Sequence, residues 1–134
     1  MSQTGLDARN RTKAWTELYA EILSAGPVRW VELLGRKCVP RIERTFLGYE
    51  LRMGKKRLPC PDMVSARYLS IFAELGFRRV AIPYRPTDTA VFLPRLERLA
   101  AQLREHASDP VRLRRAFAGI RQAILRRFPP PEEG

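Results

Sequence analysis

The sequence contains little of the side-chain chemistry on which most enzyme and metal sites depend. Its single histidine is His106, and its two cysteines are Cys38 and Cys60. Zinc modules normally bring their cysteines together in close pairs, and these three residues are too widely spaced for that pattern. We therefore expect no metal centre and no other cofactor. We also expect a binding protein and not an enzyme.

Two cysteines are too few for a disulfide-stapled scaffold. We expect buried, reduced thiols, although a Cys38–Cys60 bridge would be possible if the two flanking segments pair. No apolar run approaches the roughly 20 residues needed to span a bilayer. The first residues, MSQTGLDARNRTK, lack the apolar centre of a secretory signal. These absences lead us to expect a cytoplasmic protein without a transmembrane segment.

What is present is the composition of a folding chain. Of 134 residues, 45% are hydrophobic and 29% are charged, which separates the sequence from disordered chains. The length suits one hydrophobic core better than two. We expect a single domain over residues 1–128, and a disordered tail over residues 129–134.

The positive charge is concentrated in two segments. The formal net charge is +11. Residues 29–57 hold nine basic and three acidic residues, and residues 110–128 hold six basic residues and no acidic one. The rest of the chain carries ten basic and eleven acidic residues. Because each of the two segments has a net charge of +6, this pattern indicates binding of an anionic partner more than a uniform drift in composition.

Periodicity and chain-breaking residues predict the order helix, helix, strand, strand, helix, strand, helix, helix. The predicted helices span residues 7–24, 27–35, 62–76, 94–107 and 109–128, and the predicted strands span residues 47–53, 57–60 and 78–84. A capped turn is expected before Pro94, because proline interrupts a helix.

The fold class that this order predicts is α+β. Residues 47–60 read as a β-hairpin with its turn at GKK, and Pro59 and Pro61 confine the second strand to an edge. A helix separates this hairpin from the strand at residues 78–84. A right-handed crossover would place that strand parallel to a hairpin strand. We therefore expect a small three-stranded sheet, the hairpin plus one crossover strand, packed with helices.

The last helix has one apolar seam and a cationic back. Leu113, Phe117, Ile120, Ile124 and Phe128 are spaced 4, 3, 4 and 4 residues apart, so they share one face. The helix contains no carboxylate, and its adjacent arginines repel each other, which a helix serving only to be solvated would avoid.

Nucleic acid is the partner that this pattern favours, with contacts made mainly to phosphates. A hairpin tip could supply a second contact, and the loop GRKCVPRIER could add to it. The candidate binding residues are Arg112, Arg114, Arg115, Arg121 and Arg126 on the last helix, with Lys55, Lys56 and Arg57 at the hairpin tip.

Three other interpretations stay open. The helix could be an ordinary surface helix, it could lie on an anionic membrane, or the chain could be a non-enzymatic adaptor that docks on a larger acidic protein complex. The sequence does not distinguish DNA from RNA as the ligand.

The aromatic residues give little sign of a base-stacking platform. Trp30, Phe46, Tyr49 and Tyr84 fall in apolar patterns, where core packing is the expected use.

Overall fold

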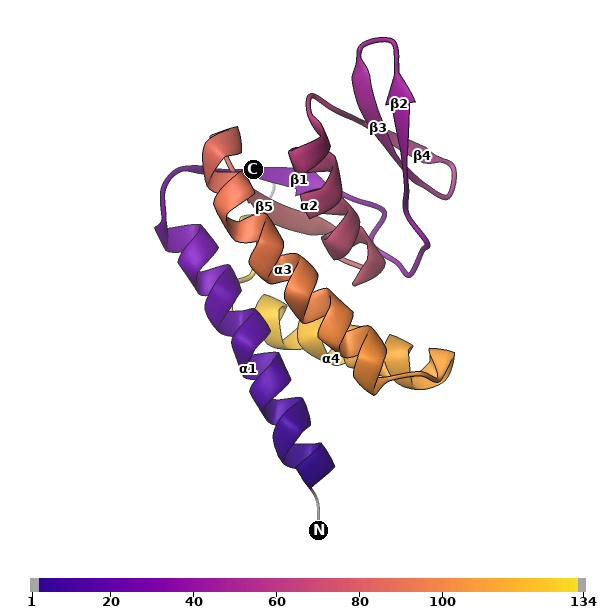
Figure 1. Cartoon of the computed structure of the whole chain (residues 1–134). Coiled ribbons are helices and arrows are strands. Elements are labelled where there is room, and N and C mark those ends of the chain that lie inside the picture. The colour runs from indigo at the N-terminus through magenta and orange to yellow at the C-terminus, as the bar shows by residue number, and fades with distance from the viewer. Residues whose placement is uncertain (1–2, 133–134) are drawn as a thin grey trace.

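The computed structural model describes residues 3–132 and contains four helices and five strands within them. The helices are α1 (Gln3–Ser24), α2 (Met63–Glu74), α3 (Pro86–His106) and α4 (Pro110–Arg127). The strands are β1 (Val28–Glu32), β2 (Arg41–Thr45), β3 (Gly48–Met53), β4 (Lys56–Cys60) and β5 (Arg79–Pro83). Figure 1 shows α1, α3 and α4 gathered on one side of a two-stranded ribbon, with α2 between this body and a three-stranded sheet. The predicted α+β class is confirmed, as is the β3–β4 hairpin.

The predicted helix over residues 27–35 is wrong, since this segment contains strand β1. Val28, Trp30 and Val31 are residue types that favour strands. The strand pairs antiparallel with β5, placing Trp30 opposite Ala81. A nine-residue apolar stretch can satisfy either periodicity, and here the ladder to a distant strand decided the outcome.

The predicted crossover sheet is also wrong, because β5 pairs with β1 and not with the hairpin. The three-stranded sheet is instead an antiparallel meander in the order β2-β3-β4. Its first strand, β2, was not predicted. Glu43 in β2 lies opposite Glu50 and forms ion pairs with Arg52 and Arg41. These ion pairs offset the repulsion between the two facing carboxylates.

Helix α3 runs through Pro94, where a break was expected. Pro94 is exposed, so the ring projects into solvent. The peptide hydrogen bond that it removes lies on the outer face of the helix.

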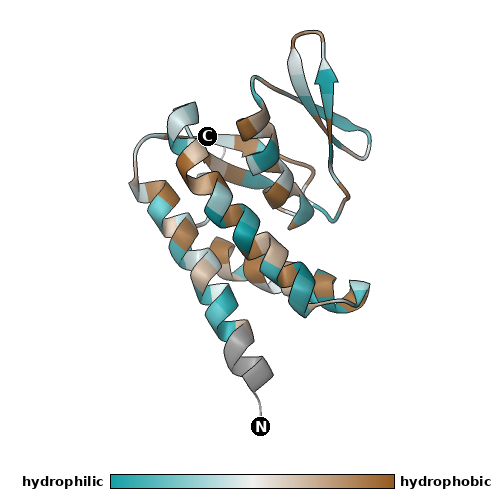
Figure 2. Ribbon diagram, in the orientation of Figure 1, coloured by the Kyte–Doolittle hydropathy of each residue, from teal (hydrophilic) through white to brown (hydrophobic). Residues whose placement is uncertain are grey.

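The core lies between the helices and the β1–β5 ribbon and extends to Leu51, Met53 and Cys60 of the three-stranded sheet. The apolar seam of α4 is confirmed, since Phe117, Ile120 and Ile124 are buried. Tyr19 of α1 packs against Phe128, with ring centroids 6.1 Å apart. Figure 2 shows brown, apolar residues alternating with teal, hydrophilic residues along the helices, as expected of helices that bury one face. Among the described residues, no helix combines the length and hydropathy that crossing a bilayer requires.

Two buried tyrosines complete the outer edge of β5. The peptide groups of Ala81 point away from β1, because hydrogen-bonded pairs alternate along an antiparallel ladder. The Ala81 N–H donates to Tyr19 Oη at 3.0 Å, and the Tyr68 hydroxyl donates to the Ala81 carbonyl at 2.6 Å. Two side chains thus take the place of a neighbouring strand and satisfy a buried peptide.

These tyrosines predict a loss of stability in alkaline solution. Burial raises the pKa of Tyr19 to about 12, against the opposing effect of the Ala81 hydrogen bond, and burial raises the pKa of Tyr68 well above 10. Above pH 10 the unfolded chain releases protons that the folded chain retains, so the free energy of unfolding falls as pH rises. From Tyr19 alone we expect a loss of about 2 kcal/mol between pH 10 and 12.

Urea unfolding between pH 9 and 12 measures this loss. In a Tyr19→Phe variant the decline should be smaller, whereas Tyr84→Phe, at an exposed position, should leave it unchanged. A flat stability profile over this pH range would contradict the role given to the buried hydroxyls.

Candidate functional site

Helix α4 is fixed at its first turn and along its inner face, which leaves most of its arginines facing outward. The Asp109 side chain accepts a hydrogen bond from the Val111 N–H at 2.9 Å and caps the helix, and Pro110 occupies its first turn. Four of the five arginines predicted as ligand contacts are exposed, and Arg121 is partly buried. The exposed four are Arg112, Arg114, Arg115 and Arg126.

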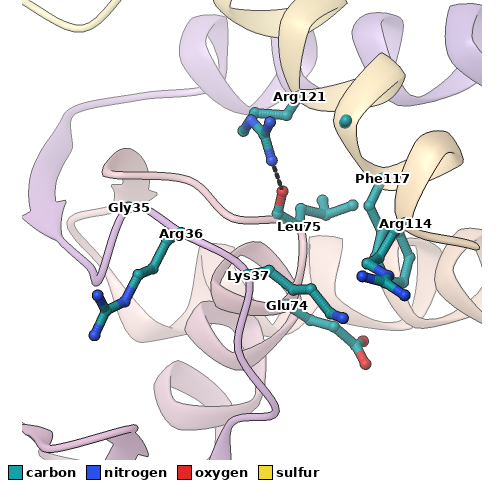
Figure 3. Close-up of a pocket in the computed structure, with 9 residues that line it drawn as sticks. Gly35, Arg36, Lys37, Glu74, Leu75, Arg114, Phe117 and Arg121 are labelled. Atoms are coloured by element: carbon teal, nitrogen blue, oxygen red, sulfur yellow. Dashed lines mark hydrogen bonds between the residues drawn. The ribbon is translucent and has the colours of Figure 1, made fainter. Parts of the chain in front are cut away.

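The two basic segments meet at one hollow of about 440 Å³. We call its four cationic residues the basic groove: Arg36 and Lys37 after β1, and Arg114 and Arg121 on α4. In Figure 3, Lys37 and Arg114 extend to the same side of the hollow as Glu74, while Arg36 points away from them. Glu74 is the carboxylate in the lining, and it is already paired with Arg104. The groove therefore gathers positive charge that its own lining does not neutralise.

Arg121 has a structural role in addition to its charge. Its Nη1 donates to the Leu75 carbonyl at 2.7 Å, and Leu75 is the C-cap residue of α2. A cation at this end of a helix also interacts favourably with the helix dipole. Gly76 makes room for the guanidinium, because a Cβ at this position would lie 2.5 Å from Arg121 Nη1. Its φ of +88° is a second reason for glycine at this position. Arg121 thus joins α4 to α2 and still has donors left for an anion.

The hairpin tip lies beside the loop that supplies Arg36 and Lys37. Lys56 Nζ donates to the Leu33 carbonyl at 3.4 Å, and a Cβ placed at Gly54 would lie 3.8 Å from Leu34 Cδ2. Arg57 Nε lies 3.9 Å from Glu50 Oε1, whereas Lys55 is exposed. The tip and the basic groove are therefore linked through residues 33–37, although two of the three predicted tip residues also make internal contacts.

Arg126 lies elsewhere, in a second hollow between α1 and α4 of about 490 Å³. Its cationic residues are Arg9, Lys13, Arg126 and Arg127. The predicted binding residues thus fall on two sides of α4 and do not form one cluster. The charge counts drew no attention to Arg9 and Lys13, because the sequence around them is nearly neutral.

The sequence predicts Arg36 and Lys37 only as accessory contacts, in the loop GRKCVPRIER. In the structure both are exposed and lie between the hairpin tip and α4. Their charge was visible in the segment count, but their position depends on β1 being a strand.

Gly119 lies in the middle of the outward, arginine-bearing face of α4. It follows Arg112 by seven residues and Arg115 by four, so the three share this face. A Cβ added there would meet nothing within 4 Å. We therefore expect Gly119→Ala to raise the free energy of unfolding by about 0.5–1 kcal/mol, since alanine favours a helix over glycine by this amount.

Urea unfolding tests this expectation, with Gly76→Ala as the matched comparison. That substitution should be destabilising, because φ at Gly76 is +88° and the new methyl would meet Arg121. Destabilisation by Gly119→Ala would show that its surroundings are not open.

The thiols have environments that favour the protonated form. Burial, with a smaller effect of Glu74, raises the pKa of Cys38, and burial raises the pKa of Cys60. Both cysteines are free. Residues 8–132, whose side chains the structure describes, contain no cluster of three or more histidine, cysteine, aspartate or glutamate side chains that could hold a metal ion.

Comparison with known proteins found no relative of this chain. No protein-family model, curated protein or solved structure matches the chain. The function proposed below therefore depends on the charges, hollows and contacts of this chain alone.

Proposed function

We propose that the protein is a nucleic-acid-binding module that holds phosphates at the basic groove, the hairpin tip and the outer face of α4. The observation that carries this proposal is the convergence of the two basic segments: Lys37 and Arg114 line one hollow whose carboxylate, Glu74, is already paired. Guanidinium groups donate in a fork that matches phosphate oxygens. Release of condensed counterions would supply much of the binding free energy.

The length of the cationic surface supports an extended ligand. Helix α4 has 18 residues and is therefore about 27 Å long at 1.5 Å per residue. Arg112 and Arg115 are exposed near its start, and residues 33–37 continue the positive charge to the hairpin tip. A nucleic-acid backbone offers regularly spaced phosphates over such a distance, whereas a small anion would use only part of the surface.

The composition of the same surface favours a polyanion over a protein partner. Stable protein interfaces have an apolar core within a polar rim. Val111 is the one large apolar side chain of α4 that is exposed within the described residues. Binding through charge alone, with little sequence preference, is the behaviour expected of phosphate contacts.

Fluorescence anisotropy with labelled duplex DNA, single-stranded DNA and RNA tests the proposal. We expect a Kd on the order of 1–100 µM at physiological salt. On duplex DNA, the logarithm of the association constant should fall with the logarithm of the salt concentration, with a slope of about −0.9 for each phosphate contact. The absence of binding to all three probes at about 50 mM salt would overturn the proposal. An acidic protein partner, the alternative that sequence analysis left open, would then be sought by pull-down.

A further inference from the structure

Two large apolar side chains occupy the turn between β2 and β3, where neither serves the fold. Phe46 is 103% exposed and Leu47 is 92% exposed. Two-residue hairpin turns usually hold glycine, asparagine or aspartate. Gly48, directly after this pair, adopts the positive φ of the turn, at +138°. A Cβ at Gly48 would lie 3.2 Å from the Cys60 carbonyl oxygen. The expectation that Phe46 packs in the core is therefore wrong.

The turn projects from a sheet that is firmly attached to the body of the protein. Leu51 and Met53 of β3 are fully buried, and β3 packs against α2. Figure 1 shows the β2–β3 turn as the outermost point of the sheet, and Figure 2 shows brown, apolar colour at this tip. A rigid projection with an apolar end is suited to insert into a partner.

The surroundings of the β2–β3 turn are cationic. Arg44, two residues before Phe46, is exposed. The nearby carboxylates have basic partners of their own: Glu43 pairs with Arg52 at 3.1 Å, and Glu50 Oε1 lies 3.9 Å from Arg57 Nε. An incoming anionic ligand would therefore meet exposed positive charge beside the apolar pair.

We propose that Phe46 stacks on a nucleobase of the bound nucleic acid, with Leu47 packing at the edge of that base. This inference rests on the function proposed above. Aromatic residues that stack on bases commonly accompany cationic surfaces that bind the backbone, and phenylalanine and leucine also enter base steps of duplexes as wedges. In Figure 1 the β2–β3 turn, the β3–β4 turn and the start of α4 follow one another along the same side of the molecule.

A bilayer is a less suitable partner for the same tip. A single acyl chain gives only marginal membrane binding, and one phenylalanine with one leucine buries still less apolar surface. Stacking on the face of one nucleobase, in contrast, requires only one aromatic ring.

The test compares wild-type protein with Phe46→Ala on single-stranded and duplex probes that carry 2-aminopurine, whose fluorescence is quenched by stacking. We expect Phe46→Ala to weaken binding about 5- to 100-fold, to abolish the change in 2-aminopurine fluorescence on binding and to leave the salt slope unchanged, since no charge is removed. Phe46→Trp should restore both affinity and signal. The single-stranded and duplex arms distinguish an unpaired base from an opened base step.

Val91→Ala is the matched control, because Val91 is an exposed apolar residue on α3, at 65% exposure. It should bind as the wild type does. Equal affinity and signal for Phe46→Ala and wild type would overturn the stacking proposal while leaving phosphate binding intact. If the wild-type protein binds none of the probes, the proposed function itself is overturned. Binding to anionic phosphatidylserine vesicles that depends on Phe46, without stacking on 2-aminopurine, would also overturn the proposal in favour of a lipid surface.

Discussion

A Tyr19→Phe/Tyr68→Phe double variant is expected to lose about 2–6 kcal/mol of unfolding free energy, because each lost hydroxyl leaves a buried peptide group unpaired at a cost of about 1–3 kcal/mol. The two hydroxyls bond the N–H and the carbonyl of the same residue, Ala81. No solvent can replace them, since Ala81 and both tyrosines are at most 1% exposed. A loss of this size is a large part of the roughly 5–15 kcal/mol that stabilises most domains.

Urea unfolding of both single variants and the double variant measures this effect. Tyr84→Phe is the control, since its side chain is exposed and its change should stay within about 0.5 kcal/mol. A double variant as stable as the wild type would contradict the proposed completion of the β5 edge.

Reversing Lys37 and Arg114 together to glutamate is expected to weaken nucleic-acid binding by about 100-fold or more at 0.1 M salt. Each phosphate contact contributes roughly one factor of ten at this salt concentration through counterion release, so two lost contacts account for this factor. The two residues come from different basic segments and line the same hollow. Both are exposed, so the substitutions should leave the fold intact.

The matched control reverses Arg29 and Arg98, which are also exposed but do not line the groove. Both double variants lower the net charge by the same amount. If the two lose affinity equally, binding follows net charge alone, and the basic groove has no special role. If the groove variant loses much more, the position of its charges matters.

Local sequence patterns predicted the features that depend on neighbouring residues. The seam of α4 follows from its spacing alone, and burial of Phe117, Ile120 and Ile124 confirms it. The start of α2 follows in the same way, since Asp62, the first residue of the predicted helix over residues 62–76, caps α2 by accepting a hydrogen bond from the Ser65 N–H at 2.7 Å.

Features that depend on distant partners could not be predicted from the same patterns. Strand β1 is defined by its pairing with β5, about fifty residues later in the chain, and its own residues fit a helix nearly as well. Leu47 fits the apolar alternation of β3, and Phe46 was expected to pack in the core, but the chain turns at this pair before β3 begins. A turn made of apolar residues carries none of the usual sequence signals.

The candidate site also combines features that the local sequence predicts with features that depend on distant parts of the chain. Charge counting identified both basic segments, but only the fold brings Lys37 beside Arg114. It also assigns Arg121 partly to capping α2 and separates Arg126 onto the α1 side of α4.

The most direct test of the basic groove uses the four lysines of the chain, Lys13, Lys37, Lys55 and Lys56. Their rates of acetylation are measured by mass spectrometry with and without a bound oligonucleotide. We predict strong protection of Lys37, with protection of Lys55 at the hairpin tip, and little change at Lys13, which lies in the other hollow. Unchanged acetylation of Lys37 in a saturated complex would contradict the assignment of the basic groove as the phosphate-binding site.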